Sequence, residues 1–117
     1  MNTNEEVLPA EELVRRVAEW GREKGINNAT MQFAKINEEV GELAHELVRG
    51  YCGSDNSVPS QETVDAIGDI LVTVIIFADI IGVDTIGALR LSYDTIRNRV
   101  GHTVNGSFIK DGEPKIN

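Results

Sequence analysis

Two short stretches of the sequence carry closely spaced carboxylates. The first contains Glu38, Glu39 and Glu42, and the second contains Asp65 and Asp69. If both stretches are helical, residues three or four apart share a face, so each set stacks acids one turn apart. Such stacks repel, and a helix built only for stability avoids them. A hard cation reverses that cost, because Mg²⁺ prefers carboxylate oxygens and keeps waters for a phosphate group. The spacing therefore predicts a magnesium site shared by two helices.

A glycine precedes the last acid of each stretch, Gly41 before Glu42 and Gly68 before Asp69. Glycine inside a helix costs about 1 kcal/mol relative to alanine. It is tolerable where two backbones, or a backbone and a ligand, come close. We therefore expect the two helices to cross near their glycines, with acids from both converging on the metal.

The pattern resembles the MazG-type, all-α nucleoside triphosphate pyrophosphohydrolases, whose signature is an E-E-x-x-E helix followed by an E-x-x-D helix. The first motif is complete in Glu38, Glu39 and Glu42. The resemblance runs from about Trp20 to the C-terminus. The tail resembles that of the short stand-alone MazG-like proteins common in phages, through Tyr93, Ile96, Arg97, Arg99, Gly101, Val104, Asn105, Gly106, Phe108 and Lys110.

The second motif departs from the family pattern. If Asp69 is the terminal Asp, Ala66 stands where the family has Glu, and Asp65 must reach in from one residue earlier. Glu62 and Asp65 also match E-x-x-D when the sequence is read literally. We favour Asp65 and Asp69, because Asp69 directly precedes the long apolar run, as the family's Asp does.

The resemblance implies an all-α fold, a four-helix MazG-type bundle that forms a dimer or a tetramer, with a short extended C-terminal tail. It implies Mg²⁺-dependent cleavage of a nucleoside triphosphate between the α and β phosphates, with Mn²⁺ as a possible substitute. The metal ligands would be Glu39, Glu42, Asp65 and Asp69. Glu38 would orient or deprotonate the attacking water, or would itself bind metal.

Four further residues are candidates for substrate binding. Lys35 shares the acidic face and is either an i,i+4 partner of Glu39, worth a few tenths of a kcal/mol, or a phosphate contact. Trp20 either anchors a core or subunit interface, or stacks on a nucleotide base. Arg97 and Arg99 are either solvated charges or contacts to the triphosphate, as the resemblance implies for basic groups near this helix end.

The periodicity of the apolar residues predicts four helices within one domain, residues 1–117. The first begins near Pro9 and ends near Lys24. The second covers 29–49 and is capped by Asn27 or Asn28. The third covers 61–81 and is capped in the Ser60 region. The fourth covers 85–100 and is ended by Gly101. The third helix is apolar nearly all round, which is typical of a helix buried in a bundle. Residues 50–60 read as a loop, and residues 103–109 have weak strand character.

Composition excludes several other classes of protein. The net charge of −8 argues against binding a nucleic acid polymer, which needs clustered basic residues. The single cysteine, Cys52, permits no intramolecular disulfide, and from the acidic, polar first residues we expect no signal peptide. The apolar run 70–81 is too short to span a bilayer, so we expect a cytoplasmic protein with no membrane partner.

Other chemistries fit poorly. The chain has no phosphate-binding G-x-x-x-x-G-K-[ST] loop. Glu42 and His45 form one Glu-x-x-His, but a di-iron bundle needs two. Five other acids, Glu5, Glu6, Glu11, Glu12 and Glu46, are assigned to the solvated surface.

Two alternatives to a general pyrophosphohydrolase stay open. A non-catalytic helical interaction module with the same fold is kept open by Ala66. A narrower enzyme acting on dUTP, dCTP or phosphoribosyl-ATP is equally compatible with the two motifs.

Overall fold

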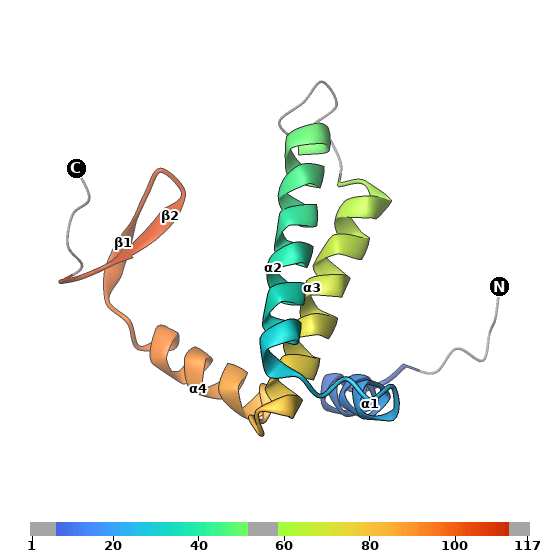
Figure 1. The fold of residues 1–117 in the computed structure, drawn as a ribbon. Helices are drawn as coiled ribbons and strands as arrows, with labels where there is room; N and C mark the ends of the chain where they lie inside the picture. Colours follow the sequence, from blue (N-terminus) through green and yellow to red (C-terminus); the bar gives the residue numbers. More distant parts are fainter. Residues whose placement is uncertain (1–6, 52–58, 113–117) are drawn as a thin grey trace. The chain divides into compact units, whose positions relative to one another are not determined.

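A computed structural model describes residues 7–51 and 59–112 of the chain, and this part is mostly helical with one small sheet (Figure 1). The chain divides into two compact units, and the boundary along the sequence falls between Ile86 and Gly87. The first unit contains both acidic stretches, and the second contains most of the last helix and the sheet.

The first unit contains three α-helices: α1, Ala10–Glu23; α2, Ala29–Glu46; and α3, Gln61–Ile80. A π-helical turn, Leu47–Tyr51, extends α2, so the predicted limits of these helices are confirmed to within a few residues. Cys52 and most of the predicted loop, 50–60, lie outside the described residues.

Side-chain caps set the starts of α2 and α3. The Asn28 Oδ1 atom accepts a hydrogen bond from the Met31 backbone N–H at 3.0 Å. The Ser60 Oγ atom does the same for the Thr63 N–H at 3.2 Å. Each cap satisfies a backbone donor that has no partner within the helix and is worth about 1 kcal/mol. Both caps are confirmed predictions.

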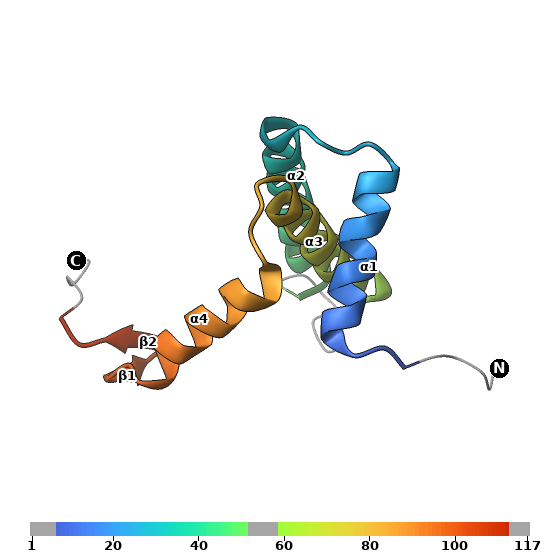
Figure 2. The same cartoon turned by 90° about the horizontal axis from the view of Figure 1, so that it is seen from below.

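Helices α2 and α3 lie side by side, and α1 packs against α3 (Figures 1 and 2). A small core forms around Ala66, Ile76 and Ala78 of α3. Gln32 of α2 is also buried, and its Nε2 donates to the Thr73 carbonyl oxygen at 3.2 Å. This side-chain contact fixes α2 against α3 close to the acidic stretches.

The close approach between helices occurs at Gly21 rather than at the two glycines singled out by the sequence. A Cβ atom added at Gly21 would lie 3.1 Å from side-chain carbons of Ile76, whereas one added at Gly41 or Gly68 would meet nothing within 4 Å. The prediction that α2 and α3 cross near Gly41 and Gly68 is therefore wrong. The pair instead approaches at smaller or hydrogen-bonded residues such as Ala66 and Gln32.

Helix α3 is only partly buried. Its buried residues are Ala66, Thr73, Ile76 and Ala78. Several large apolar residues on the same helix are exposed, and these are Val64, Ile67, Leu71 and Val74. The expectation that this helix is buried nearly all round is therefore wrong for a single copy, because α1 and α2 cover only part of its circumference.

The second unit is built from α4, Thr85–Arg97, and an antiparallel hairpin of β1, Gly101–Val104, and β2, Ser107–Lys110. Asn105 and Gly106 form the turn with φ angles of 51° and 80°. Two consecutive positive φ angles suit the right-handed twist of a two-residue hairpin, and Asn-Gly adopts them readily. The strand character predicted for 103–109 is confirmed.

Helix α4 ends at Arg97, three residues before the predicted end. Gly101 does not stop the helix but opens β1, where an added Cβ would collide with the Ile109 carbonyl oxygen and the Phe108 ring. The hairpin therefore requires glycine at this position, and the chain must leave the helix earlier to reach it. No residue of α4 is buried.

Within the described residues, no single helix is long and apolar enough to cross a membrane. Helices α3 and α4 meet that length and composition only when they are taken together across the bend between them.

The glycine contacts predict opposite effects of two substitutions on stability. Gly21→Val should lower the free energy of unfolding by about 1–3 kcal/mol, because the added side chain overpacks against Ile76. Gly68→Ala should raise it by up to about 1 kcal/mol, since the new methyl group meets open space and the helix gains propensity. Urea unfolding of both variants measures this. A Gly68→Ala protein less stable than wild type would contradict the packing described for α3.

Candidate functional site

Carboxylates from both stretches line one cleft of about 360 Å³ between α2 and α3, here called the acidic cleft. Helix α2 contributes three acids and helix α3 contributes three more. The lining residues are Glu39, Glu42, Glu46, Glu62, Asp65, Ala66 and Asp69. Six acids at this spacing repel one another, so the cleft has a strong preference for cations.

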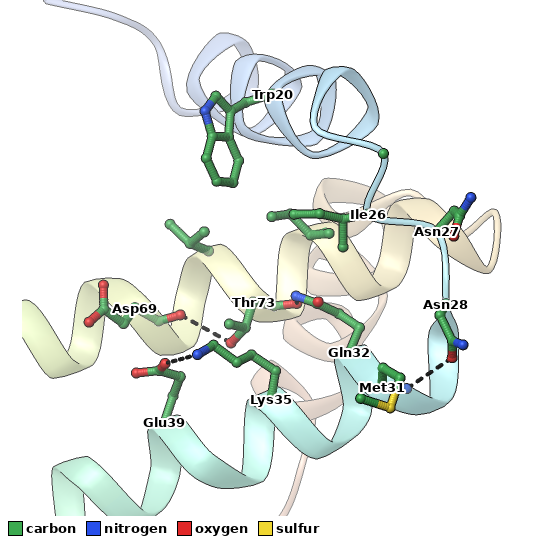
Figure 3. Close-up of a pocket in the computed structure, with 13 residues that line it drawn as sticks. Trp20, Ile26, Asn27, Asn28, Met31, Gln32, Lys35, Glu39, Asp69 and Thr73 are labelled. Carbon is green, nitrogen blue, oxygen red and sulfur yellow. Dashed lines mark hydrogen bonds and ion pairs between the residues drawn. The ribbon is translucent and has the colours of Figure 1, made fainter.

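A second, wider cleft of about 510 Å³ lies between α1, the α1–α2 connection, α2 and α3 (Figure 3). We call it the Trp20 cleft. Its walls combine an indole, aliphatic side chains and polar groups, and they are Trp20, Gly25, Ile26, Asn27, Asn28, Met31, Gln32, Lys35, Glu39, Asp69, Val72, Thr73 and Ile76. Glu39 and Asp69 line both clefts, so the two clefts meet at these carboxylates.

Lys35 faces the junction of the two clefts from α2. Its Nζ atom lies 3.5 Å from Glu38 Oε1 and 3.5 Å from Glu39 Oε1. The negative charge of Glu38 and the hydrogen bond and charge of Glu39 raise the pKa of Lys35 above its ordinary value. The i,i+4 pair predicted with Glu39 is therefore present (Figure 3).

The predicted catalytic and metal-binding residues separate into two groups. The four predicted metal ligands, Glu39, Glu42, Asp65 and Asp69, all line the acidic cleft. Glu38 is not among the residues that line either cleft, and its side chain is 60% exposed, whereas that of Glu39 is 13% exposed. Glu62 also lines the acidic cleft, so the residues of both alternative second motifs lie along it.

Glu46 is a residue of the cleft that the sequence reasoning assigned to the solvated surface. Its side chain is only 14% exposed, and it accepts a hydrogen bond from Arg49 at 3.1 Å. Its position was readable from the sequence, because it follows Glu42 by four residues and Glu39 by seven, which places all three on one helical face.

Gln32 is the other residue that the sequence reasoning missed. It lines the Trp20 cleft, is 8% exposed, and is held by its bond to the Thr73 carbonyl. The Thr73 hydroxyl donates in turn to the backbone carbonyls of Asp69 and Ile70 at 3.0 and 2.9 Å. The available signal was again helical spacing, since Gln32 precedes Glu39 by seven residues.

Among the remaining candidates, Trp20 lines the wider cleft with 48% of its surface exposed. Arg97 and Arg99 belong to the second unit, where the Arg97 Nε atom lies 3.8 Å from Asp94 Oδ1. A contact of either arginine with a triphosphate stays a prediction.

The donor chemistry of the acidic cleft suits a hard cation, because every candidate ligand is a carboxylate. In residues 7–51 and 59–112, however, no three acidic, histidine or cysteine side chains converge closely enough to hold one ion. The residue types therefore fit Mg²⁺, and the side chains would have to rearrange to coordinate it.

Comparisons with protein-family models, with curated proteins and with solved structures find no match to this chain.

The charge distribution predicts that one acid destabilises the fold and another stabilises it. Glu42 lies one turn from Glu38, Glu39 and Glu46, so Glu42→Gln should raise the free energy of unfolding by about 0.2–0.5 kcal/mol at low ionic strength. Salt should remove most of this gain, since it screens exposed charges. Chemical unfolding in metal-free buffer at low and high salt measures both effects.

Glu12→Gln is the matched control, with the opposite sign. Glu12 pairs with Arg15 at 2.7 Å and Arg16 at 3.1 Å, and hydrogen bonds from Arg15 and then Arg16 lower the pKa of Glu12 to about 2. A lowered folded-state pKa stabilises the fold above the unfolded-state pKa near 4.5. The deficit of Glu12→Gln should therefore be full at pH 7 and should disappear as the pH falls from 4.5 towards 2. Equal effects of the two variants would contradict this assignment.

Proposed function

We propose that this protein is a Mg²⁺-dependent nucleoside triphosphate pyrophosphohydrolase of the MazG type. It would cleave a (d)NTP between the α and β phosphates and release a (d)NMP and pyrophosphate. The observation that supports this most strongly is that acids of both sequence motifs line one cleft, which shares Glu39 and Asp69 with a cleft large enough for a nucleoside.

The Trp20 cleft is the proposed site of the nucleoside. The exposed indole face of Trp20 offers a surface on which a base can stack. Val72 and Ile76 provide an apolar wall, and Gln32 provides a fixed amide group. A nucleoside held there would direct its phosphates towards Lys35 and Glu39, where the acidic cleft begins.

In the acidic cleft, Glu39, Glu42, Asp65 and Asp69 would hold one or more Mg²⁺ ions, with Mn²⁺ as a substitute. A bound Mg²⁺ neutralises phosphate oxygens and lowers the pKa of a coordinated water. Glu38, exposed to solvent beside this cleft, would orient the attacking water or accept its proton, while Lys35 would contact the phosphates. The oxygen of the attacking water would bond to phosphorus while the α–β phosphoanhydride bond breaks, and pyrophosphate would leave.

The proposed function also includes a four-helix MazG-type bundle that self-associates. The apolar residues left exposed on α3, such as Val64 and Leu71, favour a second copy that covers them, as a dimer or a tetramer. Light scattering tests this, because a mass equal to a single chain at micromolar concentration would contradict self-association.

One observation favours a non-catalytic helical interaction module instead. Ala66 lines the acidic cleft at the position where the MazG signature has Glu, and it is buried, so one potential ligand is missing. A narrow enzyme acting on dUTP, dCTP or phosphoribosyl-ATP remains the alternative within the same class.

A substrate screen distinguishes these three functions. The purified protein with Mg²⁺ should release pyrophosphate from at least one common or modified (d)NTP or from phosphoribosyl-ATP. Adding excess chelator should abolish the release, because the acids alone cannot neutralise the phosphates. Release from one substrate only indicates the narrow enzyme. No release from any of them, by protein that is folded, supports the non-catalytic module.

Two matched variants test the second motif. Asp69→Asn should lower turnover by at least about 100-fold while preserving the fold, because asparagine keeps the shape but loses the charge that binds Mg²⁺. Glu62→Gln should have a much smaller effect if Asp65 and Asp69 are the working pair. The measurement is pyrophosphate release at saturating Mg²⁺, with a melting curve for each variant. The reverse ranking would assign the site to Glu62 and Asp65.

A further inference from the structure

Lys35 occupies an unusual position among the residues of the two clefts. It is the only cationic side chain among the described residues that line either cleft. It contacts Glu38 and Glu39 equally, at 3.5 Å each. Glu39 is the less exposed of the two and is one of the two carboxylates at the junction of the clefts. The ammonium therefore neutralises a carboxylate that the proposed function assigns to the metal.

We propose that Lys35 is an exchangeable counter-ion: it holds Glu39 in the metal-free protein, yields this carboxylate to a divalent cation, and then binds the phosphates of the substrate. This inference rests on the proposed function, because it concerns the same cation and the same phosphates. It assigns Lys35 two successive partners in place of a single permanent salt bridge.

Two of the predicted ligands already have a donor on their own helix. Glu39 is drawn towards Lys35 on its own helix, while Asp65 accepts a hydrogen bond from Gln61 on α3 at 2.9 Å. A cation shared by Glu39 and Asp65 would have to compete with these local donors. A divalent cation near Glu39 would repel the ammonium, because like charges a few ångströms apart interact unfavourably.

The geometry of Lys35 allows such an exchange. Separations of 3.5 Å are longer than an ordinary charged hydrogen bond, so the contact is weak. About half of the Lys35 side chain is exposed, which leaves its flexible stem free to rotate. It also lines the Trp20 cleft, so rotation can carry the ammonium from Glu39 towards phosphates that extend from that cleft.

Arg49 provides a matched control on the same side of the molecule. It pairs with Glu46 at 3.1 Å, and Glu46 also lines the acidic cleft but is not a predicted ligand. Lys35→Met and Arg49→Met each remove one positive charge beside a cleft acid and keep an unbranched side chain. A general charge effect would act on both variants, whereas the exchange concerns Lys35 alone.

The experiment measures two affinities by calorimetry for wild type and both variants. The first is for Mn²⁺ alone, and the second is for inorganic pyrophosphate at saturating Mn²⁺. Lys35→Met should bind Mn²⁺ about two- to fivefold more tightly, because the competing ammonium is gone. It should bind pyrophosphate about tenfold more weakly, because a charged contact is lost. Arg49→Met should change both affinities by less than about twofold.

Several outcomes would overturn the exchange. Tighter Mn²⁺ binding with unchanged pyrophosphate binding would make Lys35 a permanent ion pair only. Equal changes in both variants would indicate net charge alone. If wild type releases pyrophosphate from a nucleotide but Lys35→Met binds Mn²⁺ no more tightly, the proposed function stands and the exchange fails. If wild type binds no Mn²⁺, with or without pyrophosphate, both fail.

Discussion

The mutual repulsion of six carboxylates between α2 and α3 is the constraint on which the rest of the first unit depends. These helices form its largest contact, yet the face they share is lined with Glu39, Glu42 and Asp69. Burial of Ala66 and Ile76 and the bond from Gln32 to the Thr73 carbonyl must offset that repulsion. The apolar and amide contacts lie along the same helices, so they hold acids of both helices along one cleft.

The small residues of the unit are distributed in keeping with this constraint. Gly21 allows α1 to approach Ile76, and Ala66 allows α2 and α3 to approach beside the acids. Gly41 and Gly68, in contrast, face open space next to Glu42 and Asp69. A helix-interior glycine without an internal packing role costs stability for no gain within one copy. Their position is therefore compatible with a ligand or a second copy approaching the site.

Helix limits, both side-chain caps and the grouping of the acids could be predicted from the sequence, because each follows from spacing or local hydrogen bonding along one helix. Asn28 and Ser60 are examples in which a single residue sets a helix start. Two features could not be predicted in this way. One is where α2 and α3 approach each other, and the other is that α3 is only partly buried. These depend on which neighbour a face meets, and an apolar residue such as Leu71 has the same periodicity whether its partner belongs to the same chain or to another. The position of Glu46 in the cleft follows from its helical spacing to Glu42. It was assigned to solvent because its charge alone does not distinguish a surface from a cleft.

Glu39 and Asp69 line both clefts, so binding of a nucleoside and binding of a cation would be linked through them. A nucleoside in the Trp20 cleft and a cation in the acidic cleft would both contact the same two carboxylates or their immediate neighbours. Filling one cleft would then alter the charge felt in the other, chiefly at Glu39, whose side chain is 13% exposed and therefore less screened by salt than an exposed group. Lys35 pairs with Glu39 and also lines the Trp20 cleft, so a ligand in either cleft would meet its charge. Cation and phosphates would therefore bind more tightly together than apart, because a cation at Glu39 would leave the Lys35 ammonium without that carboxylate until phosphates reach it.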